Sequence, residues 1–199
     1  MTFSTGSLDD DLQMEKDNYA EEFTARLFDS TAWKQSAYQL LEAAKLLEPK
    51  VDEFWVVLRT RPADSSSWRP WDDEFVAIYF TLCSYAIENL LKSHIVRKKR
   101  PQLEAALTSH SGLPKLLKEH NLYKLAVEAG FKALAKEEEM LLRRLTRSAL
   151  WYGRYPVPVT PGNLCRSHPS DNYDFKISLT AYTSGDRDNI RRIVKEFSI

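Results

Sequence analysis

The longest mostly apolar segment of the chain lies between Asp73 and Arg100. Its apolar residues recur at steps of three and four positions, so that one set falls along a single side of a helix: Phe75, Ile78, Tyr79, Leu82, Ala86, Leu90 and Leu91. Val76, Phe80 and Ile87 widen this stripe. A helix that is apolar around most of its circumference has to be covered by several neighbours. The pattern therefore predicts a central helix around which the other elements pack.

Two helical stretches precede the central helix. One begins near Thr31, where Asp29 or Ser30 can cap it, and its apolar stripe consists of Trp33, Ala37, Leu40, Ala44 and Leu47. Pro49 interrupts the stripe, and helical spacing resumes from Val51 to Leu58. Because proline is tolerated in the first turn of a new helix, Pro49 marks either a kink or a restart.

Three helical stretches follow the central helix. Pro101 disfavours a helical conformation at Arg100, so the central helix is expected to end there. A short helix is predicted within residues 109–130, a longer one from Phe131 to Gly153, and a last one after Asp186. Joined by short connections, these elements predict an all-α fold, an up-down bundle of four to six helices around the central one.

Polar segments mark the expected domain boundary and loops. Residues 1–28 are acidic, which is typical of a solvated arm, and residues 29–199 form the helical domain. Prolines and serines predict a loop before the central helix, and its two tryptophans, Trp68 and Trp71, are expected to fold over the core. Residues 155–175 contain four prolines and predict a long loop, which in a compact domain is often functional.

The overall composition excludes any strong global attraction to nucleic acid or to a membrane. The chain has 28 basic and 28 acidic residues, so an electrostatic argument has to rest on local clusters. Its two cysteines suit a reducing compartment, and the acidic N-terminus lacks the order of a signal peptide, so a cytoplasmic location is expected. The uncharged run from Phe75 to Ile87 is too short to cross a bilayer, and no membrane partner is expected.

One polar constellation lies within the central helix. Glu88 and Lys92 are four positions apart, with the acid before the base. This spacing fits a surface ion pair, and it fits an inward-facing polar site equally well.

A second constellation is basic and lies further along the chain. Arg147 and Arg154 are about two helical turns apart, so their guanidinium groups would face one groove and hold phosphate oxygens. Tyr155, beside Arg154, would stack on a base. Arg143 and Arg144, together with the basic run 97–100, would extend this groove into a patch for an RNA backbone. The alternative for the arginines is a solvated basic face, for the run 97–100 an exposed helix end, and for Tyr155 a place in the core.

Three short motifs resemble those of HEPN domains. Residues 86–93, with the sequence AIENLLKS, look like the second helix of that family. Ser109 and His110, followed by leucines, resemble the opening of its third helix, although Ser111 and Gly112 stand where the family has an acidic residue. The fourth helix of the family ends on a motif that this chain matches with Arg154, Tyr155 and Pro156.

The resemblance covers about residues 30–199, with an insertion near 49–72. Many HEPN domains are metal-independent endoribonucleases with an arginine followed, four to six residues later, by a histidine on one helix. None of the four histidines here has an arginine at that distance before it. The resemblance therefore implies a non-catalytic module that binds nucleotide or RNA. The expected binding residues are Lys92, Arg143, Arg147, Arg154 and Tyr155, with Glu88 and Lys92 arranging the groove.

The same resemblance implies biological partners. The Arg-Tyr-Pro form of the family is associated with toxin–antitoxin, defence or stress systems, and often with a nucleotidyltransferase partner protein. It also implies a homodimer. No cofactor is expected, and Cys165 with His168 supplies only two ligands, too few for a metal site.

Two other functions remain as alternatives. The chain would be an endoribonuclease with an atypical acid/base if Glu88 or His110 replaced the missing histidine. It would be a protein-interaction module without a nucleic-acid ligand if Trp68 and Trp71 were exposed beside the long loop.

Overall fold

The described chain is entirely helical. A computed structural model describes residues 19–60, 73–107, 112–152 and 182–199, and within these ranges it contains helices and no strand. The all-α prediction is thus confirmed. The described residues form seven α-helices, one more than the upper end of the predicted four to six.

The additional helix lies at the end of the predicted acidic arm. Residues 19–28 are helical, and the last two, Leu27 and Phe28, are buried in the hydrophobic core. This end of the segment is therefore part of the folded domain rather than a solvated arm. The acidic residues of this helix, Glu21 and Glu22, come before Leu27 and Phe28. The helix can therefore bury its apolar end while its acidic turn stays in solvent.

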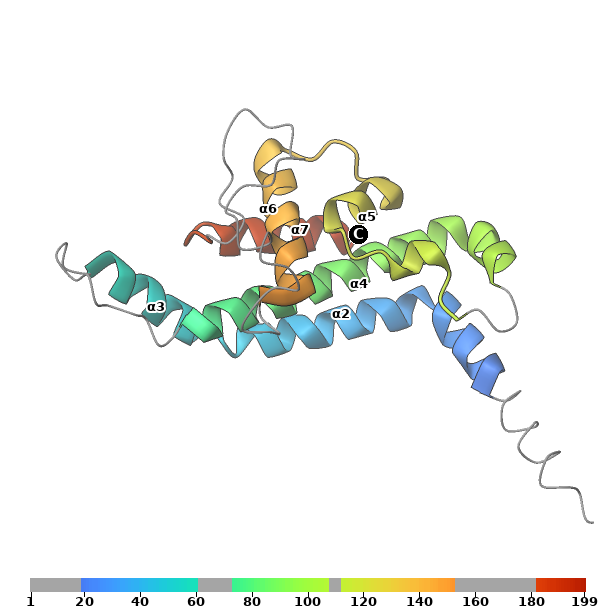
Figure 1. Ribbon diagram of the computed structural model, residues 1–199, viewed down its shortest axis with the longest axis horizontal. Helices are drawn as coiled ribbons and strands as arrows, with labels where there is room; N and C mark the ends of the chain where they lie inside the picture. Colours follow the sequence, from blue (N-terminus) through green and yellow to red (C-terminus); the bar gives the residue numbers. More distant parts are fainter. Residues whose placement is uncertain (1–18, 61–72, 108–111, 153–181) are drawn as a thin grey trace, which may run out of the picture.

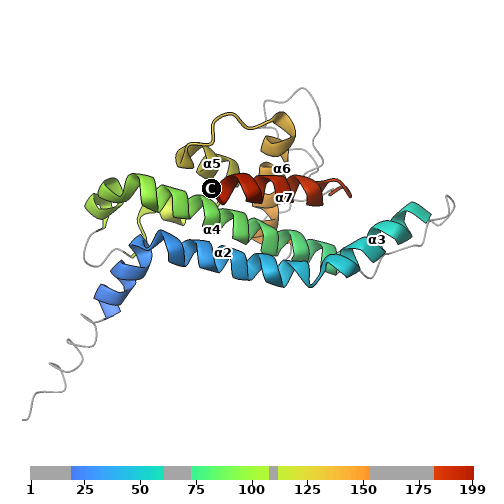
Figure 2. The ribbon, with the colours of Figure 1, turned by 180° about the vertical axis from the view of Figure 1, so that it is seen from behind.

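Helix α4, Asp73–Ala106, is the central element. Helix α2, Ser30–Lys45, runs antiparallel along it in both views (Figures 1 and 2), and four other helices also contact it. Its middle section is buried from Tyr79 to Val96 apart from Leu82, Tyr85 and Asn89, which are half-buried. The prediction of a central apolar helix covered by its neighbours is correct for this section.

The first turns of α4 differ from the prediction. Phe75 and Ile78, expected on the buried stripe, are 37% and 40% exposed, whereas Val76 and Ala77 are buried. These turns lie beside α3, Glu48–Thr60, at the end of the bundle from which α3 projects (Figure 1). Fewer helices surround them there, so only one side of the first turns is covered.

The predicted end of the central helix at Arg100 is correct to within one residue. Asp73–Ala106 consists of two helices joined across a kink, and Pro101 lies in the second of them. The break occurs one residue before Arg100, at Lys99, whose φ of −117° and ψ of 20° are not helical. Pro101 consequently lies in the first turn of the resumed helix, where its missing N–H is not needed.

Pro49 marks a restart. Helix α2 ends at Lys45, and Pro49 is the second residue of α3. The cap at the start of α2 is Asp29, whose carboxylate accepts a hydrogen bond from the amide of Thr31 at 2.8 Å. Ala37 and Ala44 are the fully covered positions of the predicted α2 stripe.

The predicted short helix after α4 is two elements. A 3-10 turn, η1, spans Lys115–Lys118, and helix α5 spans Leu122–Ala129. Asn121 caps α5 by accepting from the amide of Lys124 at 3.0 Å. Gly130 ends it with a φ of +98°, in the left-handed region that favours glycine.

Helix α6, Lys136–Arg147, begins five residues later than predicted. The amide of Ala135 donates to Glu138 at 2.9 Å, which fixes the start of the helix there. A π-helical turn, η2, follows as Ser148–Tyr152. Phe131 and Leu134, whose spacing suggested helix, pack on the core from the irregular segment before α6.

Helix α7, Asp186–Phe197, packs on α4 (Figures 1 and 2) and also reaches α2, because Lys34 of α2 donates to the carbonyl oxygen of Ser198 at 3.1 Å. Its predicted apolar face is confirmed, because Ile190, Ile193 and Phe197 are buried. No helix in the described ranges is long and apolar enough to cross a membrane.

A buried histidine holds the C-terminal end of α7 against α4. The guanidinium of Arg97 donates to Nδ1 of His94 at 3.1 Å, so the imidazole carries its hydrogen on Nε2. That Nε2–H donates to the carbonyl oxygen of Phe197 at 2.7 Å. Burial lowers the pKa of His94 below its ordinary value, and this effect exceeds the opposing effect of the hydrogen bond to Phe197.

Candidate functional site

Glu88 is the centre of a buried polar network between α4 and the segment before α5. The ammonium of Lys92 donates to Oε1 of Glu88 at 2.6 Å. Nδ1 of His120 lies 3.1 Å from both carboxylate oxygens. The network thus joins an i,i+4 pair on one helix to a histidine 32 residues further along the chain.

Exposure decides between the two predictions for this pair. The side chains of Glu88 and Lys92 are only 10% and 5% exposed, whereas the side chain of His120 is 53% exposed. Glu88 and Lys92 therefore form an inward-facing polar site rather than a surface ion pair. The only part of the network that opens widely to solvent is the imidazole.

The hydrogen bond to Glu88 sets the orientation of His120. An ionised carboxylate only accepts hydrogen bonds, so Nδ1 of His120 carries a hydrogen and donates it. Nε2 has no hydrogen-bond partner among the described residues. This nitrogen remains available to a ligand.

A cavity of about 490 Å³ lies beside this network, at η1 and the start of α5. We call it the lysine cavity, because it is lined by Lys115, Leu116, Lys118, Glu119 and Lys124. Across the described part of the chain, no carboxylate forms an ion pair with Lys115 or Lys118. His120 does not line the lysine cavity, but it directly follows Glu119, which does.

Glu119 is already saturated by donors from its own segment. It accepts from Lys124 at 2.5 Å and from the amides of His120 and Asn121 at 3.0 Å each. The hydrogen bond from Lys124 is the main cause that lowers the pKa of Glu119, and the two amides add to it. The carboxylate thus stays charged, and Lys124 and the two amides compensate its charge.

The segment that carries the lysines is held on two sides. His120 ties it to α4 through Glu88, and the amide of Leu122 donates to Oγ1 of Thr146 on α6 at 3.0 Å. Leu117 and Leu122 are fully buried on either side of the connection. The lysine cavity is therefore preorganised, which lowers the entropy that a ligand must offset on binding.

The arginines predicted to line a groove are mostly engaged within the chain. Arg143 donates to Glu139 at 3.0 Å and lies over the ring of Tyr123 at 4.5 Å, and it is only 26% exposed. Arg144 pairs with Asp186. Arg147 is half-buried near the end of α6.

Lys92, predicted as a nucleotide- or RNA-binding residue that arranges the groove, lies inside the protein. Its ammonium is buried against Glu88, so it can position neighbouring residues but does not face a ligand directly. Three further predicted site residues, His110, Arg154 and Tyr155, lie outside the described residues, as do Trp68, Trp71, Cys165 and His168.

The basic run 97–100 does not form a free patch. Lys98 donates to the carbonyl of Ala129 at 2.7 Å, at the C-terminal end of α5 where a cation is favourable. Lys99 pairs with Glu128, and Arg100 donates to Glu104 at 2.7 Å. These contacts hold the end of α4 together, and the extension of an RNA-binding patch to this run stays a prediction.

A second buried polar cluster joins α6 to α7. Arg144 donates to Oδ1 of Asp186 at 2.5 Å, and Oδ2 accepts from the amide of Thr183 at 2.7 Å. The hydroxyl of Tyr182 contacts Oγ of Ser148, and its ring stacks on Phe80 with the centroids 3.6 Å apart. All its side chains are buried or nearly so, which makes this cluster a structural joint.

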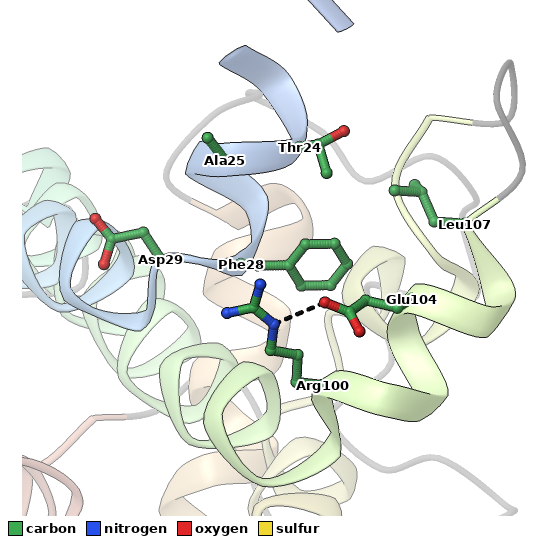
Figure 3. A pocket seen from close by; sticks show the side chains of 7 residues that line it. All are labelled: Thr24, Ala25, Phe28, Asp29, Arg100, Glu104 and Leu107. Atoms are coloured by element: carbon green, nitrogen blue, oxygen red, sulfur yellow. Dashed lines mark hydrogen bonds and ion pairs between the residues drawn. The ribbon is translucent and has the colours of Figure 1, made fainter. Parts of the chain in front are cut away.

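A cavity of about 450 Å³ lies where residues 19–28 meet the end of α4 (Figure 3). Figure 3 shows Phe28 facing Arg100, whose guanidinium lies 5.3 Å from the ring centroid. Arg100 is also bonded to Glu104, and Asp29 caps α2. The charged groups that line this cavity therefore already have partners within the chain.

A smaller cavity of about 300 Å³ lies between α2, α4 and α7, over Tyr79 and Cys83. Arg191 pairs with Glu48 at its edge, at 2.9 Å. Burial raises the pKa of the Cys83 thiol to about 12, so the group is a protonated thiol at neutral pH. The cavity therefore contains no activated nucleophile.

Comparison with known proteins identifies no relative: no protein family, no curated protein and no solved structure matches the chain. Among the described residues, no group of three or more His, Cys, Asp or Glu side chains is placed to hold a metal ion.

Proposed function

We propose that the chain is a HEPN-like module that binds the phosphates of a nucleotide or an RNA at the lysine cavity. The observation that carries this proposal is the grouping of Lys115, Lys118 and Lys124 around one cavity. Ammonium groups are general phosphate ligands, and an exposed lysine beside a phosphate gains from the release of counterions.

The buried network supports the same location. Lysines on a flexible segment would lose entropy on binding, whereas these lie on a segment anchored by His120 to Glu88. Glu88 and Lys92 belong to the motif that resembles the second HEPN helix. Their role in this function is to position the phosphate-binding segment.

Salt-dependent binding of a fluorescent single-stranded RNA tests the proposal. Replacing Lys115 and Lys118 by glutamine removes two phosphate contacts, so the slope of log affinity against log salt concentration should fall by about 1.4, or about 0.7 for each contact. The matched control is Lys45→Gln with Lys195→Gln, which removes two exposed lysines at the 300 Å³ cavity. The control should keep the wild-type slope.

Two results would contradict the proposal. One is the absence of any RNA or nucleotide binding at low salt. The other is an equal loss of affinity in both double variants, because that would indicate a diffuse charge effect rather than a site.

A second candidate function, RNA cleavage, is favoured by the hydrogen bond between His120 and Glu88. Imidazole can take up and release a proton near neutral pH, and a carboxylate behind it fixes which nitrogen does so. Nε2 of His120 would take the proton of a ribose 2′-hydroxyl as its oxygen attacks the adjacent phosphorus. The bond to the 5′ oxygen then breaks, and the imidazolium returns the proton to that oxygen.

Cleavage of a labelled RNA by wild-type protein and by His120→Gln distinguishes this candidate from binding alone. Glutamine keeps a donor for Glu88 but cannot exchange protons, so cleavage should vanish while binding persists. RNA that stays intact with the wild-type protein would exclude cleavage and leave the binding proposal in place.

A further inference from the structure

The charge of the lysine cavity indicates which kind of phosphate fits it. Among the described residues, three lysines and one glutamate line it, and together they carry two net positive charges at neutral pH. The buried pair next to it, Glu88 with Lys92, is electrically balanced. The excess of charge is therefore local to η1 and the first turn of α5.

Two of the three lysines in the described lining form no ion pair with a carboxylate of the described residues. Lys124 is shared with Glu119, whereas Lys115 and Lys118 have no carboxylate partner in the described ranges. A phosphate placed between them would meet Glu119 only as a carboxylate already bonded to Lys124 and to two amides. The repulsion from this carboxylate is accordingly reduced.

Terminal and internal phosphates differ in charge and in acceptors. A terminal phosphate, a monoester, carries about −1.5 to −2 at pH 7 and offers three strongly accepting oxygens. An internal diester carries one negative charge and offers two such oxygens. Two net positive charges on one cavity match the monoester, because a diester would leave one of them uncompensated.

The size and lining of the cavity allow more than a phosphate. About 490 Å³ is within the range of small-molecule sites. Leu116 provides an apolar surface beside the lysines, on which a sugar or a base can lie. A nucleoside monophosphate, or the phosphorylated end of an RNA, has this combination of a compact dianion and a flat, partly apolar body.

We propose that the lysine cavity binds a terminal phosphate monoester, on a free nucleotide or at the end of an RNA, in preference to internal phosphodiesters. This inference rests on the proposed function, since it names the ligand group for the same cavity. Lys115 and Lys118 are its principal ligands, and Lys124 contributes while it remains bonded to Glu119.

Affinity measurements with one RNA sequence in three forms test this inference. The RNA carries a 5′-phosphate, a 3′-phosphate or hydroxyl groups at both ends, and adenosine monophosphate is compared with adenosine to separate free nucleotide from RNA ends. A phosphorylated ligand should bind about tenfold more tightly than its hydroxyl form, or more, as one additional charge-assisted hydrogen bond predicts. Lys115→Gln with Lys118→Gln should remove most of that advantage, and Lys45→Gln with Lys195→Gln should preserve it.

The outcomes separate the two proposals. Equal affinity for phosphorylated and hydroxyl forms of the RNA would overturn the monoester inference while leaving RNA binding in place. No binding of any form would overturn both. A phosphate preference that persists in the Lys115→Gln, Lys118→Gln protein would overturn the assignment to this cavity.

Discussion

Two buried ion pairs lie on the same core and differ in what surrounds them. Glu88–Lys92 and Arg144–Asp186 have almost the same donor–acceptor distance, 2.6 and 2.5 Å. The exposed fractions of the side chains are also alike, 10% and 5% for Glu88 and Lys92 and 13% and 3% for Arg144 and Asp186. Neither distance nor burial of the pair therefore distinguishes a site from a structural joint.

The third member of each cluster makes the difference. Glu88 accepts a hydrogen bond from His120, which is half-exposed and directly follows Glu119 of the lysine cavity. Beside Arg144 lies Tyr182, which is buried against Phe80 and Ser148. Buried charges in this protein thus serve two purposes. One pair holds two helices together, and the other positions a segment that faces solvent.

The largest effect is expected from the structural joint, the ion pair Arg144–Asp186. Arg144→Met leaves Asp186 buried without its charged partner, which should lower the free energy of unfolding by about 3 to 5 kcal/mol. Adding Asp186→Leu to this variant should restore most of the loss, because an apolar pair removes the uncompensated charge. Urea denaturation at pH 7 measures both variants. A decrease in the free energy of unfolding below about 1 kcal/mol for Arg144→Met would show that this ion pair does not hold α6 and α7 together.

The ion pair Glu88–Lys92 should affect both stability and binding. Glu88→Gln keeps the shape and weakens the bonds to Lys92 and His120, so it should cost about 1 to 3 kcal/mol of stability. It should also weaken phosphate binding, because the lysine segment loses its anchor. Asp186→Asn is the matched control, and it should lower stability with unchanged affinity in the folded protein. Equal affinities in the two variants would contradict the distinction between site and joint.

A smaller effect concerns acid stability. The folded chain lowers the pKa of His94, so the unfolded chain binds a proton that the folded chain resists. His94 therefore costs no stability above about pH 6.5, and stability should fall as the pH decreases from there. In His94→Gln, which can still donate to Phe197, this part of the pH dependence should disappear. Urea midpoints at pH 7.5, 6.5 and 5.5 measure the effect, and identical pH profiles would contradict it.

The smallest effect is expected on α6. Glu139→Gln weakens an i,i+4 pair with Arg143, which also rests on the ring of Tyr123. The loss should be about 0.2 to 0.5 kcal/mol, because such pairs are weak individually. A thermal melt compares it with the wild-type protein. A loss of several kcal/mol would mean that Arg143 belongs to a buried network like that of Arg144.

Apolar spacing predicted most of the fold correctly. The stripes around Ala37 and Ile193 gave α2 and α7, since the faces they cover are continuous in sequence. Boundaries were less predictable. Phe131 has helical spacing but packs on the core from an irregular segment, and Pro101 sits where a resumed helix tolerates it. For Phe131 it is packing on the core that differs from what the local spacing indicates.

The candidate site was only partly predictable. The spacing of Glu88 and Lys92 indicated a polar pair, but their burial depends on the helices that cover α4. The sequence did not indicate His120 as a site residue, because its partner Glu88 lies 32 residues earlier and only the fold brings the two together. Arg143 and Arg144 were predicted to bind phosphate, yet each has a carboxylate partner supplied by the folded chain.

The most direct test of the central claim is the location of bound phosphate on the isotope-labelled protein. Adenosine monophosphate is titrated into the protein, and the chemical shifts of the backbone amides are followed. The account predicts that the largest changes fall within residues 115–124, with smaller ones near Glu88 on α4. Changes centred instead on α7 or on the cavity over Cys83, or no changes at millimolar ligand, would contradict it.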